Sequence, residues 1–558
     1  MVLTVDQKQE IKRLFEEKKF SELIDFINSS TDISSRPAKL FNLLGVAKLL
    51  KGKPKKDDLI SSIKDFRKGY LIETDNQPKI EALTNLINTS VELFDIENKL
   101  IDLEELVTFY TNTIVNYPSD YAVNNAMCRL FKRLNNTKKI IYHLEKMIET
   151  KNYTIGNLCD HAYHRCFEND WKQKDFFDYA GLINKNLTEY PLKYLVNFPN
   201  IKNDKIKLAF LSGDISHSHS VTYFLKTVLN NFDKEIFEIT LILNQETEDS
   251  TTEQFKSLVD RTINIINQDD IIAINEIRKF NFDIIFDLMG LTSTNRINLI
   301  RNRVAKKQIL WLGYCNTSGV KNLDYIMTDR NLIYPNEHNM YSEKVVYLPN
   351  IWNCHSGFLG QRKKIKAPIE KKNFITFGSF NNFNKINDNV IKTWSKILRK
   401  INNSKLLLKS SSNIHSNKRL ENEFKKENIL DSIEFLPREV NFEDHIKNYN
   451  KIDIALDTFP YNGVTTSFEA IWMGVPVLTM AGYNFNSRCG ESINKNLNVT
   501  NLIARNEDDY INKAIYLSNN LEELLNLRDK IFFNSLHSPL FDSKKFNNVF
   551  FEIIKNLN

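Results

Sequence analysis

The residues best suited to phosphate chemistry lie in a loop that follows the apolar run of residues 452–457 and leads into a helical pattern. Thr465 and Thr466 stand at the start of that helix, and Glu469 lies one turn further along. Backbone N–H groups and two hydroxyls at a helix N-terminus can bind a diphosphate without a metal ion. Glu469 can accept hydrogen bonds from ribose hydroxyls. The alternative interpretation is that both threonines only cap the helix.

Two further loops also leave an apolar run and enter a helical pattern. In one of them, Lys385 can reach a leaving phosphate and Asn382 can contact a base edge, unless the lysine is simply a solvated surface residue. In the other, His219 is a candidate general base or pyrophosphate ligand. The three loops together indicate a site for a nucleotide-like substrate.

Several familiar catalytic signatures are absent. The sequence contains no Gly-x-x-x-x-Gly-Lys-Ser/Thr loop, no Gly-x-Gly-x-x-Gly turn, no Gly-x-Ser-x-Gly elbow and no His-Glu-x-x-His helix. NTPase, dehydrogenase, α/β-hydrolase and zinc-protease functions therefore lose their usual support. No Asp-x-Asp pair occurs either. This absence disfavours a glycosyltransferase that holds a diphosphate through a metal ion.

The three loops are positioned by two series of short apolar strands that alternate with helical stretches. The first series is predicted at residues 206–211, 237–243, 283–288 and 308–312, and the second at 374–380, 405–409, 433–436, 452–457 and 475–480. Near-continuous apolar strands separated by helices predict parallel sheets covered on both faces. We therefore expect two doubly wound α/β domains, at residues 205–362 and 372–558. Their ligand should lie between them, at the carboxyl ends of the strands.

Residues 1–200 show helical periodicity almost throughout. Leu43, Gly45, Ala47, Phe66 and Tyr70 keep the spacing of a tetratricopeptide-type unit, and a weaker unit follows between residues 109 and 134. This spacing predicts a short array of degenerate helical repeats. A plain helical bundle is the alternative, because the Trp and the Tyr of the full repeat pattern are missing.

The overall charge says little about partners. A net charge of +6 over 558 residues is too dilute to indicate a nucleic-acid clamp. The basic segment at residues 360–368 is predicted to be an interdomain linker; a nucleic-acid patch is the alternative, although aromatic residues are not interleaved in it. No signal-peptide pattern and no run near the about 18 apolar residues of a membrane span occur. We therefore expect a cytoplasmic protein without a membrane span.

Two cysteines and two histidines between residues 159 and 166 have the composition of a metal site. Cys159 and Cys166 are seven residues apart and fall on one helix face, whereas His161 points elsewhere. A half-buried helix face is the preferred interpretation, with a zinc site as the alternative.

A set of ordered motifs gives the sequence a family resemblance. The motifs are His219-Ser220-Val221-Thr222-Tyr223-Phe224-Leu225, Asp287-Leu288-x-Gly290-x-Thr292, Trp311-Leu312-Gly313-Tyr314 with Thr317-Ser318-Gly319, Asp324 to Asp329, Tyr341-Ser342-Glu343-Lys344, Phe380-Asn381-Asn382-x-x-Lys385-Ile386, Asp453 to Asp457 through Gly463-x-Thr465-Thr466, Ser487-Arg488 and Leu502-Ile503-Ala504. In this order they resemble the protein O-GlcNAc transferase family, including its bacterial and SPINDLY-type members. The resemblance covers about residues 205–520 and has a helical repeat region in front of it.

The resemblance implies a GT-B type fold, in which two Rossmann-like domains face each other behind a helical region. It further implies an inverting, metal-independent protein O-glycosyltransferase that needs no cofactor. Such an enzyme transfers a sugar, most often GlcNAc from UDP-GlcNAc, to Ser or Thr hydroxyls of protein acceptors. Its partners would be a nucleotide sugar and a protein acceptor, with no nucleic acid.

Site residues are carried over position by position. His219 and Lys385 would be catalytic, with His219 acting either as the base or as a pocket residue. The nucleotide sugar would be held by Asn382, Lys385, His445, Thr465, Thr466 and Glu469. The donor sugar would be lined by Thr292, Leu312, Gly313 and Tyr461.

The sequence also departs from the family pattern. Cys315-Asn316 interrupts a turn that in family members often contains Pro-Gly. Val464 stands where animal enzymes carry a His against the nucleotide, and Tyr461 stands where they carry a Cys beside the sugar. Phe459-Pro460-Tyr461 instead resembles bacterial and SPINDLY-type members, among which the plant branch uses GDP-fucose. An extra residue before His219 leaves His217 as a competitor. A SPINDLY-like transferase of fucose or another hexose is therefore one alternative, and a repeat scaffold with a degenerate transferase domain is another.

Overall fold

The computed structural model describes residues 3–100, 102–189, 203–217, 219–358, 362–439 and 441–557. The chain divides into two compact units. The first comprises residues up to Asn157 together with Ser411–Leu420, and the second comprises Leu158–Ser410 and Glu421–Asn558. The predicted domain boundary near residue 200 falls within residues 190–202, which lie outside the described ranges.

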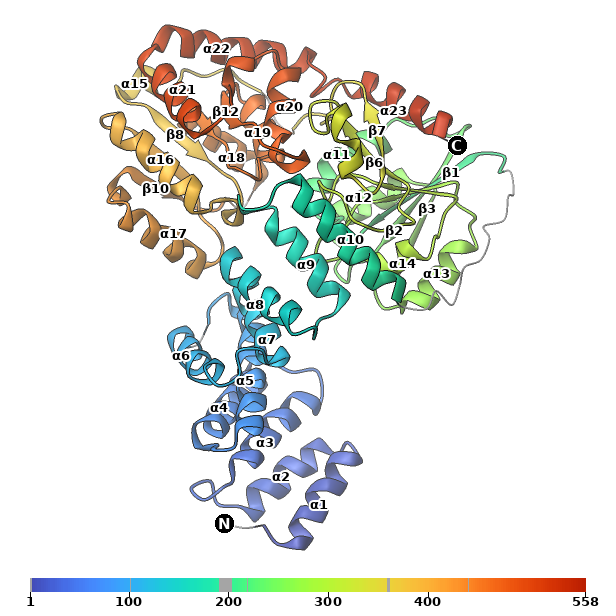
Figure 1. Cartoon of the computed structure of the whole chain (residues 1–558), viewed down its shortest axis with the longest axis vertical. Helices are drawn as coiled ribbons and strands as arrows, with labels where there is room; N and C mark the ends of the chain where they lie inside the picture. The colour runs from blue at the N-terminus through green and yellow to red at the C-terminus, as the bar shows by residue number, and fades with distance from the viewer. Residues whose placement is uncertain are drawn as a thin grey trace. The chain divides into compact units, whose positions relative to one another are not determined.

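The first unit is all-α. Its helices are α1 (Val5–Glu16), α2 (Phe20–Ser30), α3 (Ala38–Leu50), α4 (Lys56–Ile72), α5 (Asn76–Glu97), α6 (Leu103–Ile114), α7 (Tyr121–Arg133) and α8 (Thr137–Glu149), drawn in blue shades in Figure 1. Most helices pack against the next one along the chain, and α5 also packs against α7. Such a stack of sequence neighbours is typical of a helical repeat array. The apolar face of each helix is buried between its neighbours.

The helix pair α3 and α4 meets at the residues that suggested a repeat. Gly45 is buried on α3, and the ring of Phe66 on α4 is fully buried against it. A Cβ atom at residue 45 would lie 2.4 Å from the nearest carbon of that ring. The missing side chain of Gly45 therefore allows the two helices to approach closely.

Replacing Gly45 should destabilise the helical unit. Gly45→Ala forces Phe66 or the helix axis to move, which we expect to lower the free energy of unfolding by about 1–3 kcal/mol. Gly52→Ala is the matched control, because nothing lies within 4 Å of its added Cβ atom. Urea unfolding followed by circular dichroism measures both variants. Equal stabilities for the two would contradict the packing argument.

The second unit contains the first α/β domain. Its parallel seven-stranded sheet has the order β3-β2-β1-β4-β5-β6-β7. The strands are β1 (Ile206–Ser212), β2 (Phe237–Leu243), β3 (Arg261–Asn264), β4 (Ile284–Asp287), β5 (Lys307–Leu310), β6 (Tyr325–Asp329) and β7 (Lys344–Leu348). The accompanying helices are α11 (Ser220–Leu229), α12 (Ser250–Leu258), α13 (Asp270–Arg278), α14 (Ile297–Arg301) and the 3-10 helix η1 (Pro335–Met340). The strand order reverses between β1 and β4.

The second α/β domain has a parallel six-stranded sheet in the order β10-β9-β8-β11-β12-β13. The strands are β8 (Thr376–Ser379), β9 (Lys405–Lys409), β10 (Ile433–Leu436), β11 (Ile454–Leu456), β12 (Val477–Met480) and β13 (Ile503–Ala504). Its helices are α15 (Ile369–Lys372), α16 (Asp388–Lys400), α17 (Ile414–Lys426), α18 (Phe442–Lys447), α19 (Thr465–Trp472), α20 (Cys489–Asn496), α21 (Glu507–Asn519) and α22 (Leu521–Asn534). Here the order reverses between β8 and β11. The predicted two doubly wound domains are confirmed.

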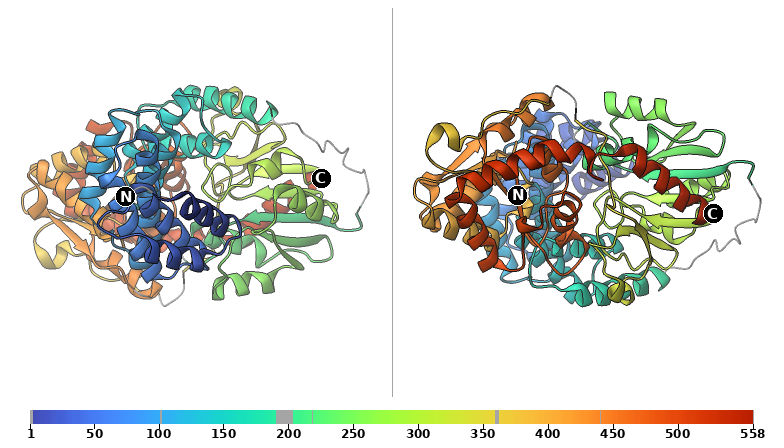
Figure 2. Two further views of the ribbon diagram at one scale, coloured as in Figure 1. Left: turned by 90° about the horizontal axis from the view of Figure 1, so that it is seen from below. Right: turned by 90° about the horizontal axis from the view of Figure 1, so that it is seen from above.

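Three helices join these domains to segments distant in sequence. Helix α9 (Ile155–Arg165) begins in the first unit and ends in the second, and α10 (Gln173–Glu189) belongs to the second. The last helix, α23 (Ser543–Leu557), returns to the first sheet (Figure 2), where Phe550 packs 5.1 Å from Trp311. Asn547 on α23 donates a hydrogen bond to the Thr227 carbonyl of α11. The C-terminal end of the chain thus covers the first domain.

The segment predicted to be a linker is fixed to the second domain where it is described. Gly360 and Gln361 lie outside the described residues. Arg362 lies over the ring of Phe532 at 4.0 Å and donates to the Ser535 hydroxyl at 2.7 Å, and Lys364 pairs with Asp529. Two of its cations are thus engaged with the protein itself.

His355, just ahead of this linker, lies in an aromatic cluster between the two domains. It is 2% exposed and packs against Tyr223 and Phe224 of α11 and Phe468 of α19. Its Nδ1 accepts a hydrogen bond from the Gly357 amide at 2.9 Å. Burial, and to a smaller degree the charge of Lys226, lower its pKa to about 3.

Stability should fall in mild acid because of His355. Its folded-state pKa lies below the unfolded value of about 6.5, so the unfolded state binds more protons as the pH falls. Between pH 7 and 5 we expect a loss of about 2 kcal/mol from this group. His355→Asn keeps an acceptor for Gly357 but does not titrate. Its stability profile, measured by thermal unfolding, should be flatter over this range; an unchanged slope would contradict the assignment.

Candidate active site

One cavity of about 540 Å³ lies between the two α/β domains. Loops that follow β1 and β4 line one side, and loops that follow β8 and β11 line the other. These strands flank the points where each sheet reverses its order, which is where open α/β sheets bind ligands. All eleven residues predicted for the site line this one cavity: His219, Thr292, Leu312, Gly313, Asn382, Lys385, His445, Tyr461, Thr465, Thr466 and Glu469.

Lys385 is a half-buried cation on the second domain's wall of the cavity. Its ammonium donates to the Asn462 carbonyl at 2.8 Å and lies 4.4 Å above the centre of the Tyr461 ring. Burial lowers the pKa of Lys385, and the charge of nearby Asp457 opposes that shift. A desolvated ammonium without a direct carboxylate contact is suited to bind an anionic group of a ligand.

The N-terminus of α19 lies on the same wall. Its N-cap is Val464, which offers no side-chain hydrogen bond to the helix. Thr466 donates its hydroxyl to Asn381 at 2.9 Å, and the Thr465 hydroxyl is buried without a protein partner. Neither threonine is therefore the N-cap residue. The first turn keeps its N–H groups and the positive end of the helix dipole for an anion.

His445 on α18 is held by two charged neighbours. Its Nδ1 lies 3.0 Å from the Lys409 ammonium, which can only donate, so the imidazole carries its proton on Nε2. That Nε2–H donates to Glu469 at 3.0 Å, and the same carboxylate oxygen accepts from the Tyr449 hydroxyl at 2.7 Å. Burial lowers the pKa of Lys409. Lys409 also lines the cavity, although it was not predicted for the site; its place at the end of the predicted strand 405–409 is the signal that could have identified it.

His219 forms the mouth of the cavity on the first domain and is the N-cap of α11. Its Nδ1 accepts from the Val221 amide at 3.4 Å, and its Nε2 lies 3.9 Å from an Asp214 oxygen. His217, the competitor, lines the same cavity. Both histidines are thus placed at the site, and His219 is the one whose ring is oriented by its own helix.

The first-domain residues that the sequence predicts beside a donor sugar lie on a tightly folded wall. Leu312 has a φ of +66°, a left-handed backbone that is uncommon for a bulky non-glycine residue. At Gly313, an added Cβ atom would lie 1.9 Å from the Leu288 carbonyl oxygen. Thr292 donates its hydroxyl to the Met289 carbonyl at 2.9 Å. This wall is set by backbone contacts rather than by flexible side chains.

Comparison with known proteins decides the family. The model of glycosyl transferase family 41 matches residues 182–377 and 355–550. The chain belongs to glycosyl transferase family 41. The family match includes every residue of the predicted site.

Individual relatives agree with the family. The Solanum lycopersicum protein named probable UDP-N-acetylglucosamine–peptide N-acetylglucosaminyltransferase SPINDLY is 33% identical over 352 residues, 61% of this chain and 37% of that protein. The Arabidopsis thaliana protein of the same name is 31% identical over 343 residues, 60% of this chain and 37% of that protein. The match therefore spans little more than a third of the length of these relatives.

A solved structure shows the same fold. A mutant of the Thermobaculum terrenum O-GlcNAc transferase superposes with a TM-score of 0.77 at 21% identity, covering 94% of this chain and 98% of that one. The expected GT-B architecture, with a helical region ahead of two Rossmann-like domains, is confirmed.

Other family 41 motif residues stabilise the fold away from the cavity. Glu343 accepts from the Thr317 hydroxyl at 2.9 Å and the Ser318 amide at 2.8 Å. Asp324 pairs with Arg303 at 2.7 Å. None of these five residues lines the cavity. The motifs therefore combine residues that face the ligand with residues that fix the loops.

The cysteine and histidine segment at residues 159–166 lies on helix α9 and the turn after it. Cys159, Cys166, His161 and His164 are all buried, so the helix face is fully rather than half buried. Across the described ranges, no three His, Cys, Asp or Glu side chains gather as a metal site. In the same ranges, no helix is both long and apolar enough to cross a membrane.

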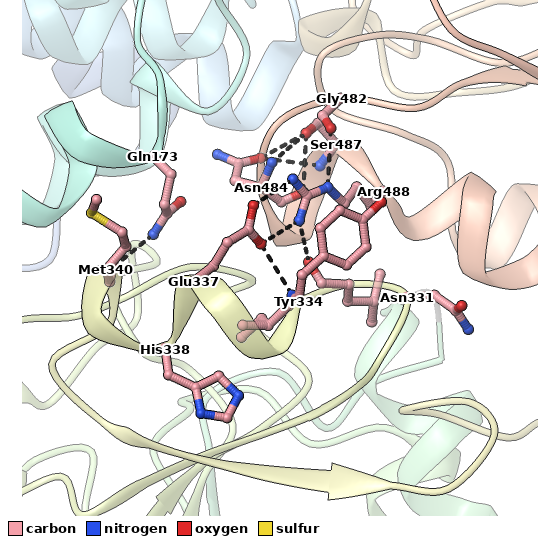
Figure 3. A network of polar contacts seen from close by, with 12 residues as sticks. Gln173, Asn331, Tyr334, Glu337, His338, Met340, Gly482, Asn484, Ser487 and Arg488 are labelled. Carbon is pink, nitrogen blue, oxygen red and sulfur yellow. Dashed lines mark hydrogen bonds and ion pairs between the residues drawn. The ribbon is translucent and has the colours of Figure 1, made fainter.

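The two α/β domains are joined beside the cavity by Arg488. This side chain, 5% exposed, forms a bidentate ion pair with Glu337 of η1 at 2.6 and 2.8 Å (Figure 3). It also donates to the carbonyls of Leu332 and Gly482 and lies 3.9 Å above the ring of Tyr334. A buried, bidentate guanidinium fixes both distance and orientation. It therefore fixes the two domains to each other at this contact.

Removing one partner of the Arg488–Glu337 ion pair should lower the free energy of unfolding, and the losses from the two single variants should not be additive. Arg488→Met leaves the Glu337 carboxylate unpaired, and we expect a loss of about 3 kcal/mol. Adding Glu337→Gln should restore part of that loss, because the stranded charge is then removed. Urea unfolding monitored by tryptophan fluorescence on the two single variants and the double variant closes the cycle. Strictly additive losses would show that the pair is not coupled.

Proposed function

We propose that this chain is an inverting protein O-glycosyltransferase that moves N-acetylglucosamine from UDP-N-acetylglucosamine to Ser or Thr hydroxyls of proteins. The observation that carries the proposal is the convergence of Lys385 and the uncapped start of α19 on one wall of the cavity. Membership of family 41 supports glycosyl transfer. The printed names of the plant relatives support this donor and a peptide acceptor.

The chemistry follows from where negative charge develops. When the bond between sugar and phosphate breaks, the leaving UDP gains charge on its terminal phosphate. Lys385 and the N–H groups at Thr465 and Thr466 are already aimed at the cavity, so they stabilise that charge without reorganising. Because the site is partly dehydrated, each contact is stronger than it would be in water.

The same arrangement supports transfer without a metal ion. A metal ion would need carboxylates that are free to coordinate it. The Asp457 carboxylate instead accepts from the Thr458 and Gly463 amides and the Thr479 hydroxyl. The Glu469 Oε2 atom is engaged by His445 and Tyr449. The positive groups of the wall take the place of the metal.

The orientation of His219 favours one of its two predicted roles. Since Nδ1 accepts from the Val221 amide, the neutral ring carries its proton on Nε2. In this tautomer it donates a hydrogen bond and cannot remove a proton through Nε2. We therefore assign His219 to orienting groups at the cavity mouth rather than to acting as the base.

Loss of Lys385 should abolish most of the transfer. Lys385→Met keeps the bulk of the side chain but removes the charge at the leaving group, so kcat should fall roughly 10²- to 10³-fold. Lys392→Met, on the exposed side of α16, is the control and should retain activity. Transfer from radiolabelled UDP-GlcNAc to proteins of a lysate measures both. Normal activity of Lys385→Met would refute the assignment.

The donor is tested by a panel of nucleotide sugars. Each is assayed for thermal stabilisation of the protein and then for transfer. Stabilisation and transfer with a GDP-hexose in place of UDP-GlcNAc would support the SPINDLY-like fucosyl- or hexosyltransferase instead. A folded protein that transfers from none of them would point to the degenerate scaffold.

A further inference from the structure

The end of helix α9 contributes an aromatic side chain to the cavity that the sequence did not single out. Phe167 is 3% exposed and lines the cavity together with Tyr163. Its ring stacks on that of Tyr461, with centroids 5.0 Å apart and planes 16° apart. In the sequence, Phe167 comes before both α/β sheets, and helix α10 lies between it and the first strand. It nevertheless forms the support of a donor-site residue.

The turn that carries Phe167 is anchored to the second domain by the side-chain amide of Asn387, which donates to two backbone carbonyls. The amide of Asn387 donates to the Phe167 carbonyl at 2.9 Å and to the Phe459 carbonyl at 3.0 Å. Asn387 is itself fixed, because its oxygen caps α16 at Val390. One buried side chain thus ties the end of α9 to the loop that bears Tyr461. The stacked pair is held from both sides.

Tyr461 in turn lies next to Lys385, the group proposed to hold the leaving phosphate. The ammonium of Lys385 is 4.4 Å from the Tyr461 ring, and the sugar is bonded directly to the phosphate that Lys385 would hold. A substituent of that sugar therefore lies against the layer formed by Lys385, Tyr461 and Phe167. Cys315 and Leu312 line the cavity as well. The depth available to the sugar depends on how far Tyr461 can retreat, and Phe167 blocks that retreat.

We propose that Phe167 is a specificity-determining residue, because it sets the size of the donor-sugar substituent that the cavity accepts by backing Tyr461. The inference rests on the proposed glycosyl transfer and adds which side chain selects the sugar. It predicts that a smaller residue at position 167 lets the Tyr461 ring move back and enlarges the sugar end of the cavity. The phosphate contacts of Lys385 and α19 stay in place.

The test compares three donors: UDP-GlcNAc, UDP-glucose and the enlarged analogue UDP-N-azidoacetylglucosamine. We expect Phe167→Ala to raise the ratio of kcat/KM for the enlarged analogue over UDP-GlcNAc at least about tenfold, the discrimination that a few atoms provide in an apolar pocket. Phe167→Leu should shift the ratio in the same direction by less. Affinity for UDP alone, measured by calorimetry, should stay within about twofold of wild type.

Phe176→Ala is the matched control. Phe176 lies on α10, is also 3% exposed and packs against Trp171, and it does not line the cavity. It should leave the donor ratio unchanged even if it lowers stability. If Phe167→Ala does not fold, the ratio for Phe167→Leu decides.

The outcomes separate this inference from the proposed function. If wild type transfers sugar but the donor ratio of the Phe167 variants equals that of wild type and of Phe176→Ala, Phe167 only stabilises the fold and the specificity role is refuted. If the donor ratio changes but the affinity for UDP also falls by more than about twofold, the effect comes from the phosphate site, and the specificity role is again refuted. If wild type transfers from no donor, the proposed function fails and this inference fails with it.

Discussion

The buried carboxylate of Asp457 orders the loop on which the cavity depends. It stands at the end of β11, is 2% exposed, and binds the amides of Thr458 and Gly463 at 2.9 and 2.6 Å and the Thr479 hydroxyl at 2.7 Å. Burial raises its pKa to about 6, so these hydrogen bonds must offset much of its desolvation. The loop they fix supplies the Asn462 carbonyl that Lys385 contacts, the Tyr461 ring and the start of α19. The start of α19 and the carbonyl that Lys385 contacts therefore both depend on one strand-end aspartate.

The opposite wall uses the same device. Asp287 ends β4 and accepts from the amides of Met289 and Gly290 at 3.0 and 3.2 Å, and burial raises its pKa to about 6. β4 and β11 occupy equivalent places, each beside the reversal point of its sheet. Two buried carboxylates thus shape the loops that face each other across the cavity. The Arg488–Glu337 pair then fixes the domains that carry these loops to each other.

These features explain what the sequence predicted and what it missed. The apolar run at residues 405–409 coincides with β9, because a central strand buried on both faces must be apolar. Four strands were not predicted: β3, β6, β7 and β13. β3 is an edge strand with one buried residue, and β13 has only two residues. β6 and β7 carry short apolar runs that were not assigned to the sheet from the sequence. Polar residues of the site were found because they stand at the ends of apolar strands. Lys409 also ends a predicted strand, but no loop motif follows it, so this signal was overlooked. Phe167 carried no local signal, since its role arises from contacts with segments far away in the chain.

The cavity combines polar groups proposed to contact the phosphates with apolar groups proposed to contact the sugar. This division also accounts for the positions at which the sequence departs from the expected motifs. Lys385, Thr465 and Thr466, which we propose contact the phosphates, match the expected family motifs, because a diphosphate requires the same cation and N–H donors whatever sugar it carries. Tyr461 stands where animal members are expected to carry a Cys, and Cys315 lies in a turn that differs from the expected motif; both line the cavity with Phe167. Apolar packing tolerates exchange of shape as long as neighbouring side chains change together. Under the proposed function, the wall that Tyr461 shares with Phe167 can therefore adapt to another sugar without disturbing the loops proposed to hold the phosphates.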